Sequence, residues 1–193
     1  MSIIMDIYVA TKSDARKQIL RNIRFKFREL SIDFKEKIFD DPVETIKYNS
    51  TGKNMVASKL VDGVVITFDT VVYIDGEVIG KPTTYDEAYR ILNKLSGKIH
   101  KVYTGVAIGD REKNIFGYGE TKVKYIELSE NLIRWYLERE EYWRYAGGYR
   151  IQGLASIFIE YVEGDFFNVI GVPIQILINL LKKYGINIYD YLE

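Results

Sequence analysis

The sequence predicts an α/β fold built on a mixed β-sheet flanked by helices. Runs of β-branched and aromatic residues alternate along the chain with segments in which apolar residues recur at helical spacing. A hairpin signature, Asp75-Gly76 between two apolar runs, indicates an antiparallel pair of strands, so the sheet is not purely parallel. With 47% hydrophobic and 28% charged residues, the 193-residue chain has a globular composition, and we expect one domain over residues 1–193.

The first third of the chain predicts two strands and two helices. Ile3 to Ala10 has strand composition, and Arg16 to Leu30 carries apolar residues near helical spacing with basic residues opposite them. A weaker helix is predicted from Ile46 to Val61, ahead of a strand from Val64 to Phe68. The hairpin turn follows that strand.

The middle of the chain predicts a helix and two further strands. Thr84 with Glu87 three residues later forms a capping box, and apolar residues then follow at helical spacing. Strands are predicted from Ile99 to Ile108 and from Thr121 to Leu128, joined through a glycine-rich turn near Phe116 to Gly119.

The last third predicts two helices on either side of a strand. Ser129 can cap the first of these helices. Leu154 to Val162 has strand composition, and Pro173 opens a final helix that Gly185 ends.

Charge and cysteine content exclude several classes of site. Lys and Arg number 27 and Asp and Glu 27, so net charge favours neither a nucleic-acid nor a membrane partner, although Lys12 to Lys37 is locally basic. The chain has no cysteine and one histidine, which removes thiolate and multi-histidine metal sites. The N-terminus lacks the pattern of a signal peptide and no apolar run reaches membrane-spanning length, so we expect a cytoplasmic protein.

A carboxylate, Asp69, interrupts an apolar run and needs a physical reason. Burying it unpaired would cost several kcal/mol, about the penalty of an uncompensated charge. Lys81 follows in a Gly-Lys-Pro loop after the hairpin. Together the two residues would supply an anchor for a divalent cation and a counter-charge for a polyphosphate. Each also has an ordinary structural explanation, as a strand-bend carboxylate and as a turn lysine.

Three other features have both a functional and a structural interpretation. The loop between the first strand and the first helix carries Ser13 and Arg16, which suit phosphate oxygens but also fit a simple helix cap. We favour a structural role for His100, which lies in an alternating strand. The aromatic stretch from Trp135 to Tyr149 could stack on a base, and we favour a core role for it.

Five segments, in order and over nearly the whole chain, resemble the Maf family of nucleoside triphosphate pyrophosphatases. They read SDARK, FDTVVYIDGEVIGKP, EAYRILNKLSGKIHKVYTGVAI, YAGGYRIQG and GDFFNVIGVP. The resemblance implies a bent mixed sheet of the Maf/ITPase-like type, with a cleft between two lobes. It also implies hydrolysis of a nucleoside triphosphate to the monophosphate and pyrophosphate, a divalent cation (Mg²⁺ or Mn²⁺) and a homodimer.

Site residues follow from the resemblance position by position. Asp69 matches the proton acceptor and could also hold the metal, while Thr70 and Gln152 match base-selecting positions of the branch acting on dTTP and UTP. The phosphate-side positions are Ser13, Arg16, Lys53 and Lys81. The metal-side acid would be Glu44 or Asp41, and the spacing leaves both open.

The chain departs from the family pattern at its first motif. Asp14 and Ala15 stand where Pro and the first Arg are usual, so a base-selecting guanidinium is missing and preference for a pyrimidine is in doubt. The segment RNIRFKFREL resembles a lengthened first helix, from which another arginine could substitute.

The residues fit the chemistry that the family implies. Attack of water on the α-phosphorus needs a base, a cation and positive groups at the leaving pyrophosphate, but no covalent nucleophile. A metal and lysines would then explain why Asp69 is tolerated in its apolar run. Two alternatives are a non-catalytic regulator of septum formation, which would not depend on Asp69, and a nucleic-acid-binding module using the basic Lys12–Lys37 edge.

Overall fold

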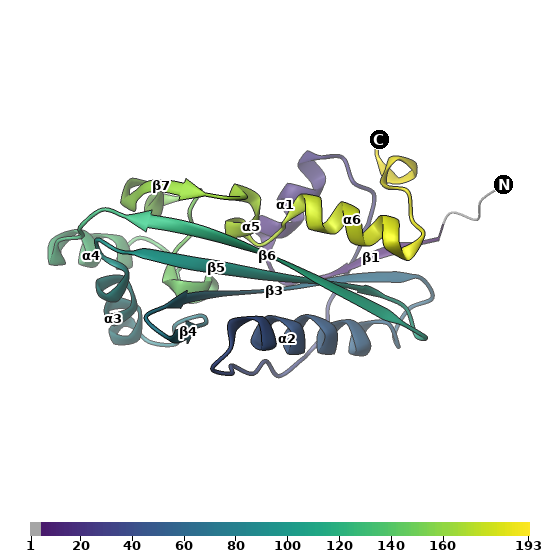
Figure 1. Ribbon diagram of the computed structural model, residues 1–193, viewed down its shortest axis with the longest axis horizontal. Coiled ribbons are helices and arrows are strands. Elements are labelled where there is room, and N and C mark those ends of the chain that lie inside the picture. Colours follow the sequence, from purple (N-terminus) through teal and green to yellow (C-terminus); the bar gives the residue numbers. More distant parts are fainter. Residues whose placement is uncertain (1–4) are drawn as a thin grey trace.

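The computed structural model describes residues 5–193 and contains a seven-stranded mixed sheet flanked by helices (Figure 1). The strand order is β2-β1-β3-β5-β6-β7, with β4 paired to β3. The strands are β1 (Ile7–Ala10), β2 (Arg28–Leu30), β3 (Val64–Ile74), β4 (Glu77–Ile79), β5 (Ile99–Gly109), β6 (Asn114–Tyr125) and β7 (Ile159–Glu163). The predicted α/β class with a mixed sheet is confirmed. Ile3 and Ile4 of the first predicted strand lie outside the described residues.

Helices cover both faces of this sheet. The α-helices are α1 (Asp14–Asn22), α2 (Pro42–Ala57), α3 (Tyr85–Leu95), α4 (Glu130–Leu137), α5 (Phe166–Ile170) and α6 (Ile174–Tyr184). Short 3₁₀ helices are η1 (Tyr142–Arg144), η2 (Ala146–Gly148), η3 (Leu154–Phe158) and η4 (Ile188–Tyr191). Helix α2 lies on one face, α1 and α6 lie on the other, and α3 and α4 gather at the far end of the long strands (Figure 1).

Two hydrophobic clusters divide the molecule into two lobes along the long strands. One contains Phe68 of β3 and Val106 of β5 together with residues of α1 and α6. The other contains Val72 of β3 and Val102 of β5 together with residues of α3 and α4. Phe68, Thr70 and Val72 lie on the same face of β3, because alternate residues of a strand point to the same side. Thr70 therefore lies between the two clusters. A polar belt therefore crosses the sheet where the two cores meet.

The edge of β3 is open at this belt. Strand β1 pairs in parallel with Val64–Thr67 of β3, and β4 pairs with Val72–Ile74. Within the described part of the chain, residues 68–71 of β3 have no paired strand on that side. A buried backbone carbonyl without a strand partner needs another hydrogen-bond donor, so we expect side chains to donate to the carbonyls in this gap.

The predicted first helix is wrong in its second half. Helix α1 ends at Asn22, because Arg24 takes a positive φ of 56° and the Phe25 amide donates back to the Leu20 carbonyl. The chain then reverses and residues 28–30 form β2, parallel to β1. The apolar residues counted as one helix face thus pack from two different segments, and RNIRFKFREL is not a lengthened helix.

Two predicted strands also have different bounds. The hairpin between β5 and β6 turns at residues 110–113, whereas the glycines near Phe116 to Gly119 lie within β6. A Cβ at Gly119 would lie 2.6 Å from the Asn168 side-chain oxygen, so this glycine is needed for the close approach of α5. The strand expected from Leu154 begins only at Ile159, after η3.

Local signals at the ends of elements are confirmed. Asp75 and Gly76 form the hairpin turn with φ of 52° and 80°. Thr84 and Ser129 accept hydrogen bonds from the first turns of α3 and α4. Helix α6 starts after Pro173 and ends at a left-handed glycine, as the sequence predicts.

Candidate active site

Asp69 lies at the open edge of β3, with its carboxylate held from α2. The side chain is 7% exposed. Its two oxygens accept from the Lys53 ammonium at 2.8 Å and from the Asn49 amide at 3.0 Å. Both partners lie four residues apart on one face of α2, which packs on β3. The buried Asp69 carboxylate is therefore stabilised by one cation, Lys53, and one neutral hydrogen-bond donor, Asn49.

Lys53 joins two carboxylates and a main-chain carbonyl. Its ammonium lies 2.8 Å from Asp69, 2.5 Å from Glu36 and 3.2 Å from the Phe68 carbonyl oxygen. That carbonyl is one of the groups left unpaired by the gap between β1 and β4. Three oxygen acceptors thus surround the Lys53 ammonium.

Asn49 also fixes the segment that carries Glu36. Its amide exchanges two hydrogen bonds of 2.9 Å with the main chain of Lys37 while it donates to Asp69. A Cβ at Gly52 would lie 2.4 Å from the Phe34 ring, so the missing side chain lets the segment lie against α2. These contacts bring the Glu36 carboxylate beside Asp69.

Burial and the lysine shift the two carboxyl groups in opposite directions. Burial raises the pKa of Asp69 above its usual value, and Lys53 opposes that rise. Burial alone would also raise the pKa of Glu36, but Lys53, Lys81 and Arg16 together lower it. Asp69 is thus the carboxyl group with the greater affinity for a proton, which suits a proton acceptor.

Arg16 is committed to the protein's own main chain. Its guanidinium donates to the Gly171 carbonyl at 3.1 Å, to the Thr70 hydroxyl at 2.7 Å and to the Phe68 carbonyl at 3.5 Å. Thr70 in turn shares a 2.9 Å hydrogen bond with Thr104. Arg16 reaches this position because Ser13 caps the N-terminus of α1 and accepts from the Arg16 amide. The first helix, β3 and the segment before α6 are joined at this side chain.

Lys81 approaches from the loop after β4. Burial and the nearby Arg16 lower the pKa of its ammonium, whereas Glu36 raises it. Unlike Lys53, Lys81 forms no ion pair within the described part of the chain. Its charge is therefore available to a ligand.

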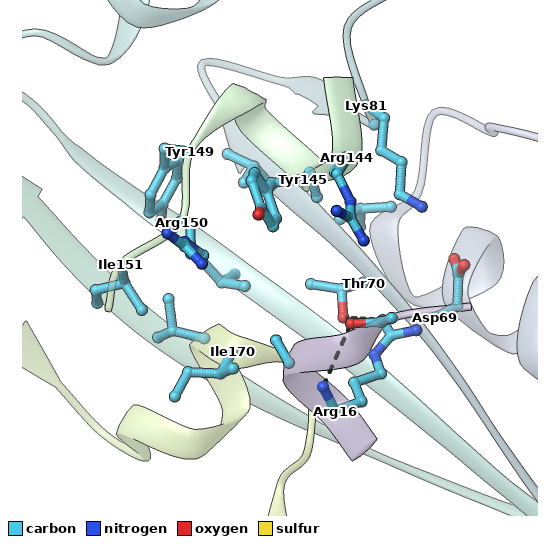
Figure 2. Close-up of a pocket in the computed structure, with 18 of the residues that line it drawn as sticks. Arg16, Asp69, Thr70, Lys81, Arg144, Tyr145, Tyr149, Arg150, Ile151 and Ile170 are labelled. Atoms are coloured by element: carbon cyan, nitrogen blue, oxygen red, sulfur yellow. Dashed lines mark hydrogen bonds between the residues drawn. The ribbon is translucent and has the colours of Figure 1, made fainter. Parts of the chain in front are cut away.

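A cavity of about 250 Å³ unites these groups and has two chemically different ends (Figure 2). Figure 2 shows Asp69, Lys81 and Arg16 gathered at one end. At the other end Tyr145, Tyr149 and Arg150 lie close to Ile151 and Ile170. The first group will be called the charged end and the second the base end. Further residues that line the base end are Val72, Val102, Val169 and Gln152.

The base end is formed by the irregular segment after α4. Gly147 and Gly148 both have positive φ, of 70° and 73°, which lets this segment turn back along the cavity. His100 lies behind its wall, where its Nε2 and the Tyr149 hydroxyl are 2.7 Å apart. Burial lowers the pKa of His100 to about 3, so the ring stays neutral, and its predicted structural role is confirmed. The aromatic stretch is divided, since Tyr136 is buried in the core while Tyr145 and Tyr149 line the cavity.

Most of the residues singled out from the sequence meet at this cavity. Its lining includes Ser13, Ala15, Arg16, Asp69, Thr70, Lys81 and Gln152. Lys53 borders the adjoining hollow and contacts Asp69 directly. Their assigned roles stay predictions, but the chain brings them together from five separate segments.

Glu44 and Asp41 are not brought to the cavity. Asp41 caps α2 and accepts from the Glu44 amide at 2.7 Å, and both side chains are exposed in the first turn of that helix. Glu36 instead lines the cavity and shares Lys53 with Asp69. The spacing between β2 and α2 could not reveal this, because residues 31–39 are irregular and no periodicity fixes where their side chains point.

Sequence reasoning also missed Asn49, Arg144 and Arg150. Arg144 and Arg150 line the cavity, and Asn49 holds Asp69. A polar residue such as Asn49 in the interior of a helix is a recognisable signal, since burial requires a partner for its amide. The two arginines carry no comparable signal, because a basic residue in an aromatic segment is equally typical of a solvated surface.

The carboxylates suit a divalent cation only if the ligand completes its coordination. The Asp69 and Glu36 carboxylates and the Phe68 carbonyl are hard oxygen ligands, and they converge on the point that the Lys53 ammonium fills, so a divalent cation bound between them would displace that ammonium. Within residues 5–193 no cluster of three or more histidine, aspartate or glutamate side chains is found. Such a sparse set is typical of Mg²⁺ sites in which phosphate oxygens and water supply the remaining ligands. Among the same residues, no helix combines the length and apolar character needed to cross a membrane.

Comparison with known proteins gives a consistent result. The family model described as Maf-like protein matches residues 6–184. A protein of Clostridium tetani named dTTP/UTP pyrophosphatase is 38% identical over 192 residues, covering 95% of this chain and all of its own. Proteins with the same name from Pyrococcus furiosus and Pyrococcus abyssi are 40% identical over 178 residues and 49% identical over 127. These two matches cover 91% and 66% of this chain, and 94% and 68% of the relatives.

Among solved structures, the Ham1 protein of Staphylococcus aureus matches with a TM-score of 0.48 and 15% identity. The match covers 62% of this chain and 71% of that one.

Proposed function

The chain belongs to the Maf family, and from that premise we propose that it hydrolyses nucleoside triphosphates to the monophosphate and pyrophosphate. The observation that carries the proposal is the pairing of Asp69 with Lys53 at one end of a cavity whose other end is apolar and aromatic. A triphosphate requires the first environment and a nucleobase the second.

Asp69 acts as the general base in this reaction. Its carboxylate accepts a proton from a water molecule as the water oxygen bonds to the α-phosphorus. The bond from the α-phosphorus to the bridging oxygen breaks, and pyrophosphate leaves with that electron pair. The raised pKa of Asp69 increases its affinity for the proton, while the Lys53 ammonium opposes that rise by favouring the ionised carboxylate.

Positive groups at the charged end stabilise the charge that develops on the phosphoryl oxygens. Lys81 has no ion-pair partner among residues 5–193, so its ammonium can turn toward the leaving pyrophosphate. Arg16 remains hydrogen-bonded to Thr70 and the main chain, so its guanidinium contributes a positive charge held in a fixed position near the α-phosphate. Ser13 adds the N-terminus of α1, where a phosphate oxygen is favoured.

A divalent cation, Mg²⁺ or Mn²⁺, would be held by Asp69 and Glu36 together with phosphate oxygens. When bound, it supplies charge neutralisation at the transferring phosphoryl group. Glu36 replaces Glu44 in this proposal because it lies beside Asp69, whereas Glu44 faces solvent. Lys53, which holds both carboxylates in the free protein, keeps them from repelling each other.

The relatives suggest dTTP and UTP as substrates, and modified nucleoside triphosphates are the alternative. Thr70 and Gln152 line the cavity and would contribute to the choice of base. We further infer a homodimer, as the family resemblance implies, and a cytoplasmic protein that does not bind nucleic acid, as the N-terminal sequence and the balanced charge suggest. Light scattering of the purified protein tests the dimer, and titration with DNA at low salt tests nucleic-acid binding.

One experiment tests the reaction directly. The protein is incubated with dTTP, UTP, CTP, GTP and ATP in the presence of Mg²⁺, Mn²⁺ or a chelator, and the products are separated. We expect monophosphate and pyrophosphate in equal amounts and loss of activity with chelator. Release of orthophosphate in place of pyrophosphate, or no cleavage of any triphosphate, would refute the proposal.

A further inference from the structure

Arg150 lies at the base end of the cavity with most of its hydrogen-bonding capacity unused. Its guanidinium makes one long contact, 3.4 Å from a terminal nitrogen to Glu140. Its Nε is buried without a hydrogen-bond partner among the described residues. A guanidinium carries five N–H donors, and a buried donor without an acceptor costs about 1–3 kcal/mol. The rest of the guanidinium is open to the cavity, since the Arg150 side chain is 41% exposed, and its terminal nitrogens are therefore free to donate to a ligand bound there.

The surroundings of Arg150 are built to accommodate it. A Cβ at Gly153 would lie 2.6 Å from the Arg150 Nε and 3.0 Å from a Glu140 carboxylate oxygen, so only glycine leaves room for this pair. The guanidinium carbon lies 5.8 Å from the centre of the Tyr145 ring. Figure 2 shows the Arg150 guanidinium between Tyr145 and Ile151, with Asp69 at the opposite end of the group of side chains.

Arg144 provides an internal comparison. It lines the same cavity, yet its guanidinium donates to Asp14 and to Glu141, both at 2.8 Å. Two good carboxylate contacts satisfy it, and these contacts raise its pKa. The two neighbouring arginines thus differ in one respect, which is whether the protein itself has used their donors.

We propose that Arg150 reads the nucleobase and selects bases whose edge carries a ring carbonyl oxygen over bases that carry an amino group at that position. The inference rests on the proposed function, since it identifies the substrate class of the same cavity. The reason is chemical. Arginine only donates, so it matches the carbonyl of uracil, thymine, guanine or hypoxanthine, whereas the amino group of cytosine or adenine presents a second donor.

Two pairs of substrates isolate this effect. UTP and CTP differ at one edge of the pyrimidine ring, where uracil has a carbonyl oxygen beside a ring N–H and cytosine has an amino group beside an unprotonated ring nitrogen. ITP and ATP differ in the same way on the purine ring. The readout is the ratio of kcat/KM within each pair, which cancels changes in catalysis common to both members. We expect the wild type to favour UTP over CTP and ITP over ATP, each by about tenfold or more.

Arg150→Met keeps a long side chain but removes all the donors. We expect both ratios to fall by about tenfold, toward one. Arg150→Lys keeps the charge without the planar fork and should give intermediate ratios. Arg144→Met is the matched control, because Arg144 lines the same cavity but donates to two carboxylates of the protein, and both ratios should stay as in the wild type.

Arg150→Met also leaves the buried Glu140 without its partner, so a Glu140→Gln/Arg150→Met double variant is measured beside it. Unchanged ratios in both variants would overturn the inference and assign Arg150 to a structural ion pair. A wild type that favours CTP and ATP would overturn it as well.

Failure of the inference and failure of the proposed function give different results. Cleavage of triphosphates with ratios that ignore Arg150 refutes the inference alone. If the wild type cleaves none of them, the proposed function fails, and calorimetric binding of UMP and CMP then tests Arg150 without catalysis. Binding of UMP over CMP that Arg150→Met abolishes would support the inference, and equal binding of the two would overturn it.

Discussion

The two ends of the cavity differ in how completely the protein satisfies its own polar groups. At the charged end, Lys53 has three oxygen partners and Arg16 has three acceptors. All of these contacts are formed within the protein itself, without a ligand. At the base end, Arg150 has one long contact and a buried nitrogen without a partner. A site whose groups are already positioned can stabilise a transition state without reorganising, which is where electrostatic catalysis is most effective.

The difference separates rate from selectivity. Substitutions at the charged end should reduce turnover for every base alike, because the groups there contact only phosphate and water. Substitutions at the base end should change the ratio between bases and leave the chemistry in place.

The largest effect is expected from Asp69→Asn. The amide is nearly isosteric but cannot accept the proton from water or hold a cation, so we expect turnover to fall by about 10²-fold or more for every triphosphate. The measurement is the initial rate of monophosphate release. Asp62→Asn, which changes an exposed carboxylate paired with Arg111, is the control and should retain activity. Near-normal turnover in folded Asp69→Asn would refute the role of Asp69.

The same variant has a defined effect on stability. Because the pKa of Asp69 is raised above 3.8 in the folded chain, the folded state binds this proton more tightly than the unfolded chain does. Its contribution to stability is therefore present below about pH 3.8 and is lost as pH rises through the raised pKa. An amide does not ionise, so Asp69→Asn should unfold at pH 7 at a temperature no lower than the wild type.

Lys53→Met should combine a large loss of activity with a shift in pH dependence. Lys53 is the main group that opposes the effect of burial on Asp69, so its removal raises the Asp69 pKa further. The acid limb of the kcat/KM profile should move to higher pH, and activity at neutral pH should fall by about tenfold or more. A profile with an unchanged acid limb would show that Asp69 is not the titrating group. Lys47→Met, an exposed change on the same helix, is the control.

Lys81→Ala is expected to have a smaller effect. Its ammonium can move toward the leaving pyrophosphate, and such a group acts most strongly where charge develops. We expect kcat/KM to fall by about tenfold for all bases with little change in thermal stability, because Lys81 has no ion pair to lose. Lys98→Ala, which removes an exposed partner of Asp75, controls for loss of a surface charge. Equal kcat/KM in Lys81→Ala and the wild type would make Lys81 an ordinary turn lysine.

Much of the charged end could be predicted from the sequence, because its residues lie beside strong local signals. Asp69 interrupts an apolar strand, Ser13 precedes a helix, and Lys81 follows a hairpin whose turn residues are unmistakable. The fold class followed from the same periodicities. The positions of these charged-end residues depend on how β3 pairs. Strand β3 is held by β1 before the gap and by β4 after it.

The remaining parts could not be predicted, and the reasons are physical. Residues 24–30 have helical spacing, but Arg24 takes a left-handed conformation and tertiary pairing with β1 overrides the local pattern. Glu36 and Arg150 lie in irregular segments, where no period relates a residue's number to the direction of its side chain. Selectivity is therefore the least predictable property, because the base end is built mostly from such a segment.

The smallest effect concerns position 15, where the family's usual arginine is replaced by alanine. Ala15 and Arg150 line the same cavity, so an arginine introduced at position 15 would offer donors to a base that Arg150 already contacts. In the wild-type background we expect Ala15→Arg to change the UTP/CTP ratio by less than about tenfold. In the Arg150→Met background it should restore much of the lost preference, worth about 1–3 kcal/mol for a charge-assisted hydrogen bond. The double-mutant cycle over these four proteins gives the coupling energy. Additive effects of the two changes would mean that positions 15 and 150 act on different parts of the substrate, and Ala15 would then be a neutral replacement for which Arg150 does not compensate.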